Sequence, residues 1–281
     1  MSSVITSITG LQNLSNLSQL RADFNALTSI DLSGMTNLTY VDVSDQDSIV
    51  DGSNCLTSIN LSGCTSLEQL RLDDSNFSAG LPDLSDCTSL TLVDFDQCGL
   101  VGSVDMSNLP ALEFIDLNGN LGLTELIISS TQPLGDNGNE VVLDSCAFSQ
   151  TAVDNILLTL ASSSVSGGYT NLSANSGTNS APGAAGREAL FVLNSKGWSF
   201  AVETGYHNML SLAYEVTEGA ICASTNTSIY YTVSGSSLTI GNKLYTNSDA
   251  WNPAINGWYA TGSLKFQVSG SGTIVTTGSC V

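Results

Sequence analysis

The sequence predicts an α/β solenoid, with a parallel sheet on one face and short helices in its last turns, followed by a small all-β domain. Three observations lead to this prediction. A nine-residue frame recurs through the first half of the chain, two later segments carry helix signals, and from Tyr206 onward short aromatic and β-branched runs alternate with glycine-containing turns. We place the solenoid at residues 1–203 and the all-β domain at residues 204–281.

The recurring frame has apolar residues at positions 1, 4 and 6 and often a small or polar residue at position 9. Its five copies are LSQLRADFN, LTYVDVSDQ, LEQLRLDDS, LTLVDFDQC and LEFIDLNGN, which begin at Leu17, Leu38, Leu67, Leu90 and Leu112. A short strand cannot bury positions 4 and 6 alone, so consecutive frames must stack. Five consecutive matches to LxxLxLxxN/C predict a leucine-rich repeat, with the ninth side chain capping backbone groups where the chain turns away.

The later turns are predicted to contain helices. Val141, Leu143 and Cys146 fill positions 4, 6 and 9 of a further frame, and SQTAVDNILLTLA then has the apolar period of a helix. A strand at YTNLSANSG follows, with Tyr169, Leu172 and Ala174 in the core positions. AAGREALFVLNSKG predicts a second helix, with Pro182 near its start and Gly197 just beyond its end, and WSFAVE predicts a last strand.

The seven cysteines are an odd number, so at least one thiol is expected to be free or paired between chains. Met35, Cys64 and Cys87 each lie three residues before the next frame and are expected to stack inside the core. The seven cysteines form no CxxC motif and no cluster with histidine, which argues against a zinc site. Cys222 and Cys280 lie near the ends of the predicted second domain, where a disulfide and a free pair both remain open.

Two parts of the chain resemble proteins of phages. LDSCAFSQTAVDNILLTL and NLSANSGTNSAPGAAGREALFVLNSKGW resemble the closing repeats of leucine-rich-repeat proteins from phages of Bacteroidetes bacteria and from their hosts. LYTNSDAWNPAINGWYATGSLKFQVSGSGTIVTTGSC resembles a small module that recurs in tail and other virion proteins of such phages. Neither resemblance implies a catalytic residue set, and both imply recognition or attachment. The chain ends in TTGSCV, unlike cargo of the gliding-associated secretion system, which usually ends with a basic tail.

Charge excludes one class of partner. The chain has 6 Lys and Arg against 26 Asp and Glu, a formal net charge of -20. Affinity for nucleic acid depends on clustered Lys and Arg, so no nucleic-acid partner is expected, and anionic membrane surfaces are disfavoured. No apolar run approaches the roughly 18 to 20 residues that cross a bilayer, so no membrane insertion is expected. MSSVITSITGLQNL lacks a secretory signal pattern, which leaves another export route or a removed signal.

No pattern in the sequence indicates catalysis. The single histidine, His207, is interpreted as an ordinary residue near a strand edge, and no GxSxG, GxxxxGK[ST], HExxH or GxGxxG motif is present. A glycosidase needs only two suitably spaced carboxylates, so it stays as a minor alternative. Four acidic residues lie close together in sequence and could bind calcium: Asp42, Asp45, Asp47 and Asp51. They lack an EF-hand spacing, so the pattern favours a solvated loop over a calcium site. We therefore expect no catalytic residues, no metal and no cofactor.

The candidate ligand face comprises the residues that each frame sends outward, at positions 3 and 5. These residues are Gln19, Arg21, Tyr40, Asp42, Gln69, Arg71, Leu92, Asp94, Phe114 and Asp116, and position 7 adds a third column of Asp23, Ser44, Asp73, Asp96 and Asn118. Aromatic anchors flanked by Arg are typical of interface centres. The alternative is that the acidic columns only solvate the sheet and that neighbouring side chains partly cover the apolar residues.

These observations predict a non-enzymatic binding protein at a virion surface. The solenoid would recognise a host-surface protein or glycan, and the carboxy-terminal domain would attach it to other virion proteins. Homo-oligomerisation is also open. The alternatives are a structural or decoration protein that contacts only other virion proteins, and a secreted or cell-surface bacterial leucine-rich-repeat adhesin.

Overall fold

The computed structural model describes residues 4–46 and 56–202, and beyond them the strands between residues 208 and 279. The chain divides into two compact units, residues 1–181 with 192–203 and residues 182–191 with 204–281. The predicted boundary at Thr204 lies outside the described residues, as do His207, Cys222 and Cys280. None of the helices in the described part is long and apolar enough to cross a membrane.

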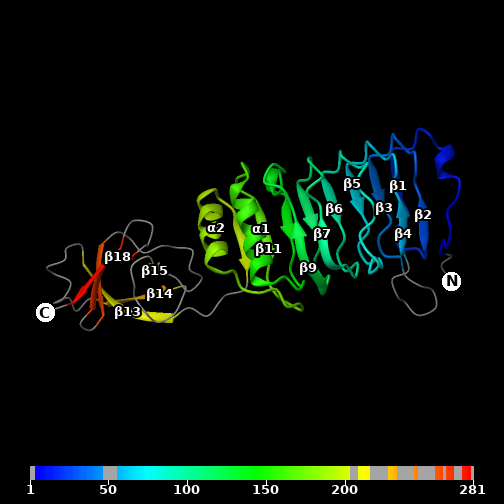
Figure 1. Ribbon diagram of the computed structural model, residues 1–281. Helices are drawn as coiled ribbons and strands as arrows, with labels where there is room; N and C mark the ends of the chain where they lie inside the picture. The colour runs from blue at the N-terminus through cyan, green and yellow to red at the C-terminus, as the bar shows by residue number, and fades with distance from the viewer. Residues whose placement is uncertain are drawn as a thin grey trace. The chain divides into compact units, whose positions relative to one another are not determined.

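The first unit contains an eight-stranded parallel sheet to which each turn contributes one short strand (Figure 1). In spatial order the strands are β1 (Gln19–Arg21), β3 (Tyr40–Asp42), β5 (Gln69–Arg71), β6 (Leu92–Asp94), β8 (Phe114–Asp116), β10 (Glu140–Val142), β11 (Tyr169–Leu172) and β12 (Ser199–Val202). This large parallel sheet with few helices agrees with the predicted α/β solenoid-like class. The leucine-rich-repeat assignment stays a prediction.

Positions 4 and 6 of the frames form the core behind this sheet. All ten side chains at these positions are at most 9% exposed: Leu20, Ala22, Val41, Val43, Leu70, Leu72, Val93, Phe95, Ile115 and Leu117. The position 4 residues of neighbouring strands pair in register from Leu20 to Ile115. Each buried side chain therefore packs between its counterparts in the adjacent turns.

Side chains at position 9 bind backbone groups where each turn leaves the sheet. Asn120 is fully buried, its Nδ2 donates to the carbonyls of Phe95 at 2.9 Å and Leu117 at 2.8 Å, and its Oδ1 accepts from the N–H of Leu100. Gln46 donates to the carbonyl of Ala22 in the same manner. The cysteines at this position do so through sulfur, since Cys98 Sγ lies 3.1 Å from the Leu72 carbonyl. The expected capping role is confirmed for these residues.

Position 8, just before this cap, has a left-handed backbone in every frame. The residues are Phe24, Asp45, Asp74, Gln97, Gly119 and, in the sixth frame, Ser145. Most residue types pay for positive φ in steric strain, and Asn, Asp and Gly pay least. Non-glycine residues adopt this φ in the other frames, but a β-carbon on Gly119 would lie 2.7 Å from Cγ of Gln97, so the space at this position favours glycine.

The return legs of the turns form a second row of short strands. In it β2 (Ser29–Asp31) pairs with β4 (Ser58–Asn60), and β7 (Val101–Asp105) pairs with β9 (Gly122–Ile127). The leg between these two pairs, residues 81–85, is not a strand. Two 3-10 turns, Leu11–Asn13 and Asp136–Gly138, complete the secondary structure before the helices.

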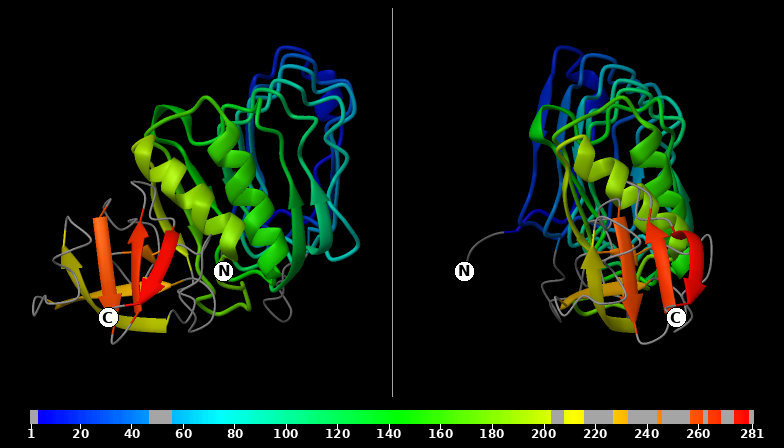
Figure 2. Two further views of the ribbon diagram at one scale, coloured as in Figure 1. Left: turned by 60° about the vertical axis from the view of Figure 1, so that its left-hand side comes forward. Right: turned by 90° about the vertical axis from the view of Figure 1, so that its left-hand side faces the viewer.

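Two helices follow, as the apolar periods predict. The helix α1 (Gln150–Ser162) packs against β9 (Figure 2), and α2 (Ala184–Ser195) ends shortly before Gly197. Ser149 caps α1 because its hydroxyl accepts the N–H of Ala152. At the other end Lys196 Nζ donates to the carbonyls of residues 161 and 163, where a cation also suits the helix dipole.

The register predicted for β11 is wrong for two of its three core residues. We expected Tyr169, Leu172 and Ala174 to occupy the core positions. Leu172 is fully buried as predicted, but Tyr169 and Ala174 are half-buried, and Thr170, which pairs with Val141, is fully buried instead. Thr170 can occupy position 4 because its hydroxyl donates to the carbonyl of Val141 at 3.0 Å. Because threonine is polar, the apolar pattern of the sequence does not identify it as a core residue.

The second unit contains a six-stranded antiparallel sheet. The strands lie in the order β15 (Leu244–Tyr245), β14 (Thr227–Thr232), β13 (Asn208–Glu215), β16 (Gly257–Thr261), β17 (Leu264–Val268) and β18 (Ile274–Ser279). Five of them overlap runs that the alternating pattern of the sequence predicts as strands, namely SIYYTVSG, SLTIGNKLYT, NGWYATG, LKFQVSG and GTIVTTG, and β13 was not predicted. That residues 204–281 form an all-β domain stays a prediction, since the segments between these strands lie outside the described residues.

Replacing Asn120 with Ala should destabilise the first unit. The change leaves the carbonyls of Phe95 and Leu117 and the N–H of Leu100 without this partner in a buried site, so we expect a loss of about 2 to 4 kcal/mol in the free energy of unfolding. Urea denaturation followed by circular dichroism measures it. Asn37→Ala is the control, because Asn37 is exposed and makes one hydrogen bond, to Ser15. Equal losses in both variants would contradict the proposed role.

Cys64, Cys87, Cys98 and Cys146 should resist alkylation in the native protein. All four are buried free thiols, as the frame predicts, and burial raises the pKa of Cys87 and of Cys146 to about 12. The reactive thiolate is therefore scarce as well as shielded. Iodoacetamide labelling followed by peptide mass spectrometry should modify them only after unfolding. A Cys64–Cys87 disulfide in the peptide map, or labelling of these thiols in the native state, would contradict this prediction.

Candidate binding face

The outward residues of the first five strands lie in register as predicted. Gln19 aligns with Tyr40, Tyr40 with Gln69, Gln69 with Leu92, and Leu92 with Phe114. The position 5 column, Arg21, Asp42, Arg71, Asp94 and Asp116, runs alongside it through the same pairings. The sheet thus brings together side chains up to 97 residues apart in sequence, from Gln19 to Asp116, on one surface.

The apolar residues of this face are less exposed than expected. Tyr40, Leu92 and Phe114 are half-buried, whereas we expected an exposed column. The physical reason is the strand spacing of about 4.8 Å, which stacks each large side chain against its neighbours. Phe24, at position 8 of the first frame, is instead 72% exposed. The face therefore presents only part of each of these side chains to solvent.

A cation, an aromatic ring and a carboxylate meet at the amino-terminal end of the face. The Arg21 guanidinium carbon lies 4.8 Å from the centre of the Tyr40 ring, a cation–π geometry. The Tyr40 hydroxyl donates to Asp42 Oδ2 at 3.1 Å, and the Ser44 hydroxyl donates to Asp42 Oδ1 at 2.7 Å. Burial and the Asp42 carboxylate raise the pKa of Tyr40, so its hydroxyl stays a donor. These contacts hold the side chains in fixed positions before any partner binds.

One ion pair crosses the middle of the face. Arg71 Nη1 lies 2.6 Å from Asp94 Oδ2, with the two side chains 35% and 13% exposed. Burial raises the pKa of Asp94, while Arg71 acts in the opposite direction. Arg71 therefore compensates a mostly buried carboxylate and is less free to meet a partner than its sequence position suggested.

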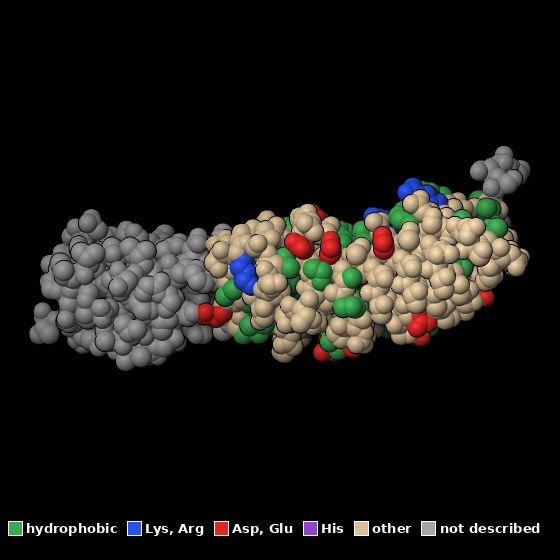
Figure 3. All heavy atoms as spheres, turned by 90° about the horizontal axis from the view of Figure 1, so that it is seen from above, with side chains coloured by type: hydrophobic (Ala, Val, Ile, Leu, Met, Phe, Trp, Pro, Cys, Tyr) green, Lys and Arg blue, Asp and Glu red, His purple; other side chains and the backbone are tan. Residues whose placement is uncertain are grey.

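An acidic strip follows this ion pair. It comprises Asp73, Asp94, Asp96, Asp116 and Asp144, from positions 5 and 7 of adjacent frames. Burial raises the pKa of Asp73 and of Asp116 to about 7, and nearby carboxylates add to both shifts. The pKa of Asp96 is raised for the same reasons. At neutral pH Asp73 and Asp116 are therefore incompletely ionised. In the view of Figure 3 acidic side chains stand among a mostly uncharged polar surface, and basic ones are few.

Asp144, which belongs to the sixth frame, was not predicted from the sequence. Asp73 and Asp96 were predicted only in the third column, at position 7, and not among the residues at positions 3 and 5. The signal for them is the recurrence of Asp at position 7 beside an Asp at position 5. Their partial burial, which follows from the packing of adjacent turns, is not visible in that pattern.

The described residues offer no metal centre. No group of three or more His, Cys, Asp and Glu within them is arranged to hold a metal ion. Among the residues that could form the less favoured calcium site, Asp42 accepts hydrogen bonds from Tyr40 and Ser44, and Asp47 and Asp51 lie outside the described residues. The chemistry of the face consists of hydrogen bonding, ion pairing and aromatic contact.

Comparison of the chain with protein-family models, with curated proteins and with solved structures finds no match. The interpretation of the face therefore depends on its geometry and on the sequence patterns.

Stability should increase on acidification from pH 8 to pH 5. The folded pKa of Asp73 and Asp116, about 7, lies above the ordinary value of 3.8, so the folded state binds protons more tightly than the unfolded state. Between about pH 4 and 7 the free energy of unfolding should therefore fall as pH rises. Because solvent still reaches and screens both carboxyls, we expect only about 1 to 2 kcal/mol.

Urea denaturation at pH 5, 6, 7 and 8 measures this dependence. The double variant Asp73→Asn/Asp116→Asn should be more stable than the parent at pH 8 and should show a flatter pH profile. Asp31→Asn is the control, because Asp31 lies in the second row and backbone and side-chain hydrogen bonds from Ser33 lower its pKa. A parent protein that loses stability between pH 8 and pH 6 would contradict the prediction.

Proposed function

We propose that this chain is a non-enzymatic binding protein of the leucine-rich-repeat type, which recognises a host-surface protein or glycan through positions 3 and 5 of its sheet. The observation that carries the proposal is the in-register assembly of those two columns on one face. No activity is needed to account for any of these side chains. The proposal includes no cofactor and no nucleic-acid partner.

The composition of the face supports protein or glycan recognition. Its amino-terminal end combines an exposed Arg21 with the ring of Tyr40, and its other end carries Phe114 in the strand that also contributes Asp116. Tyr and Arg are enriched where interfaces concentrate their binding energy. Half-buried rings held by neighbours lose little freedom on binding, which favours affinity.

We place the protein at a virion surface, with an extracellular or cell-surface location as the alternative. This part of the proposal is supported by the sequence resemblances to proteins of Bacteroidetes phages. In it, residues 204–281 form an all-β attachment module that contacts other virion proteins, while the solenoid remains free to bind. Mass spectrometry of purified virions should detect the chain. Its absence from them would favour the secreted adhesin.

The double variant Tyr40→Ser/Phe114→Ser should lose binding to host cells while keeping its fold. Binding of the labelled full-length chain to a panel of Bacteroidetes cells should fall at least about tenfold, since each ring is a candidate anchor. A matched control is Ile127→Ser/Leu158→Ser, which also removes two large apolar side chains but from β9 and α1. Circular dichroism melting curves should show that both variants fold.

A charge variant tests the same face independently. Arg21→Glu should weaken binding with little effect on stability, because Arg21 is exposed. Arg71→Glu is unsuitable, since it would place a second carboxylate beside the mostly buried Asp94. Undiminished cell binding by Tyr40→Ser/Phe114→Ser and by Arg21→Glu would refute the assignment of the ligand face. Binding of the parent protein to virion proteins but to no cell would favour a decoration role.

A further inference from the structure

The second row of strands is interrupted at Pro82. Four legs share an Asx turn in which Asp31, Asn60, Asp83 or Asp105 accepts the N–H of the serine two residues later. This shared turn aligns Pro82 with Ile30, Ile59 and Val104, the residues that come just before the Asx residue in β2, β4 and β7. Proline has no N–H to give to a ladder. The 81–85 leg accordingly pairs with neither β4 nor β7.

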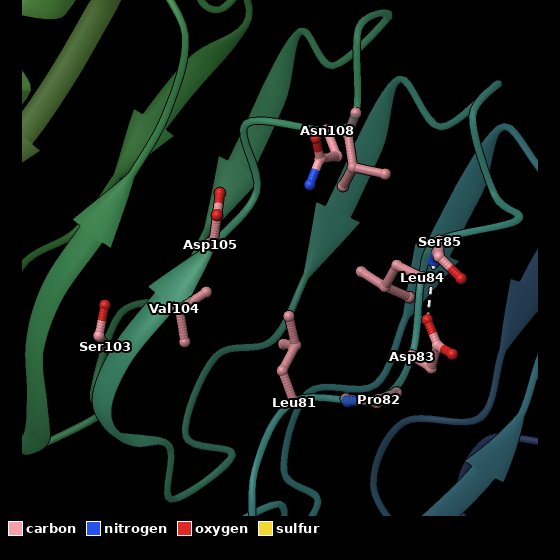
Figure 4. A pocket seen from close by; sticks show the side chains of 10 residues that line it. Leu81, Pro82, Asp83, Leu84, Ser85, Ser103, Val104, Asp105 and Asn108 are labelled. Atoms are coloured by element: carbon pink, nitrogen blue, oxygen red, sulfur yellow. Dashed lines mark hydrogen bonds between the residues drawn. The ribbon is translucent and has the colours of Figure 1, made fainter.

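A groove of about 590 Å³ lies between this leg and β7 (Figure 4). Buried Leu84, Val104 and Leu109 form its apolar floor. Asp83, Ser85, Ser103, Asp105 and Asn108 form an exposed polar rim. A volume of this size lies within the range of ligand pockets. The groove belongs wholly to the first unit and is separate from the candidate binding face.

The edge of β7 beside this groove is free. In a parallel ladder alternate residues bond to opposite neighbours. Met106 N–H donates to Ile127 of β9, and Gly102 C=O accepts from the Thr124 hydroxyl of the same strand. Ser103 and Asp105 therefore direct their backbone groups away from β9. Within residues 56–202 no backbone group of the 81–85 leg bonds to them.

The rim carries two carboxylates. Hydrogen bonds from Ser85 lower the pKa of Asp83, and those from Ser107 lower the pKa of Asp105, so both are ionised at neutral pH. In each, Oδ1 accepts from the serine, and no hydrogen bond within the described chain occupies Oδ2. The groove has no basic residue. Charge complementarity therefore selects a cationic occupant.

We propose that this groove binds an extended Lys- or Arg-containing segment of a partner protein, which adds as a strand to the free edge of β7. Ser103 and Asp105 supply the ladder hydrogen bonds. Alternate side chains of the segment point to opposite faces, so apolar ones lie on Leu84, Val104 and Leu109 while basic ones reach Asp83 and Asp105. The proposal does not depend on the ligand of the sheet face.

A blocked pentapeptide, acetyl-Val-Lys-Val-Lys-Val-amide, is the probe. Titration of the full-length chain by calorimetry should give saturable binding at low salt. Asp83→Asn/Asp105→Asn should weaken it by about tenfold, because two exposed ion pairs are lost while the Asx turns keep an acceptor. Asp31→Asn is the matched control: Asp31 occupies the same position in β2, is exposed and makes the same turn with Ser33, but lies outside the groove. It should bind the peptide as the parent does.

Two further measurements separate strand addition from simple charge attraction. The same peptide with its central amides N-methylated keeps both charges but cannot donate to the edge, so its binding should fall at least about tenfold. Pro82→Ile restores a backbone N–H to the 81–85 leg and supplies the side chain found at the aligned positions of β2 and β4. This variant should close the ladder and lose peptide binding without losing its thermal transition.

Several results would overturn the proposal. Equal weakening by Asp31→Asn would mean that the peptide responds only to the overall negative charge. Unchanged affinity of the N-methylated peptide, or unchanged binding by a folded Pro82→Ile variant, would exclude addition to the β7 edge. Failure of the parent protein to bind the peptide, or its binding of neutral oligosaccharides at this groove instead, would exclude a basic segment as the occupant.

Discussion

The strands of the main sheet are three or four residues long, and each has two inward positions in its frame. A strand this short cannot exclude water from its own side chains, so each turn is stable only between two others. Val93 and Ile115 are fully buried because they are stacked in register, and the same stacking fixes what the outer face carries. Every feature of that face, including the position of Arg21 over Tyr40, follows from the requirement that the inner columns align.

At the edges of the sheet, hydrogen bonds from side chains to backbone carbonyls add to this apolar packing. Asn120, Gln46 and the sulfur atoms of Cys98 and Cys146 take up carbonyls that the turn leaves without a partner. Thr170 performs a related task inside the sheet. Asp73 and Asp116 have the opposite effect on stability. Burial removes water from their carboxyl groups and raises their pKa, so keeping them ionised at neutral pH destabilises the folded state. The candidate binding face therefore includes two carboxyls whose burial disfavours the folded state at neutral pH.

The sequence predicted the parallel sheet, the two columns and both helices, because apolar spacing alone determines them. It did not predict the position of Thr170, since its burial depends on a hydrogen bond to Val141 in the preceding turn. The half-buried state of Tyr40 and Phe114 depends on contacts between turns and is likewise absent from a single frame. Pro82 was visible in the sequence, but its effect becomes apparent only when the neighbouring legs are seen to be strands.

The frames beginning at Leu38 and Leu67 are 29 residues apart, whereas the other spacings are 21 to 23. The strands β3 and β5 nevertheless pair in the same register as the rest, Tyr40 with Gln69 and Asp42 with Arg71. The length of chain between two frames can therefore vary by several residues without a shift in the register of the sheet, because added chain length has a small entropic cost. Related chains could thus differ in the spacing of their frames while the order and register of their strands stay the same.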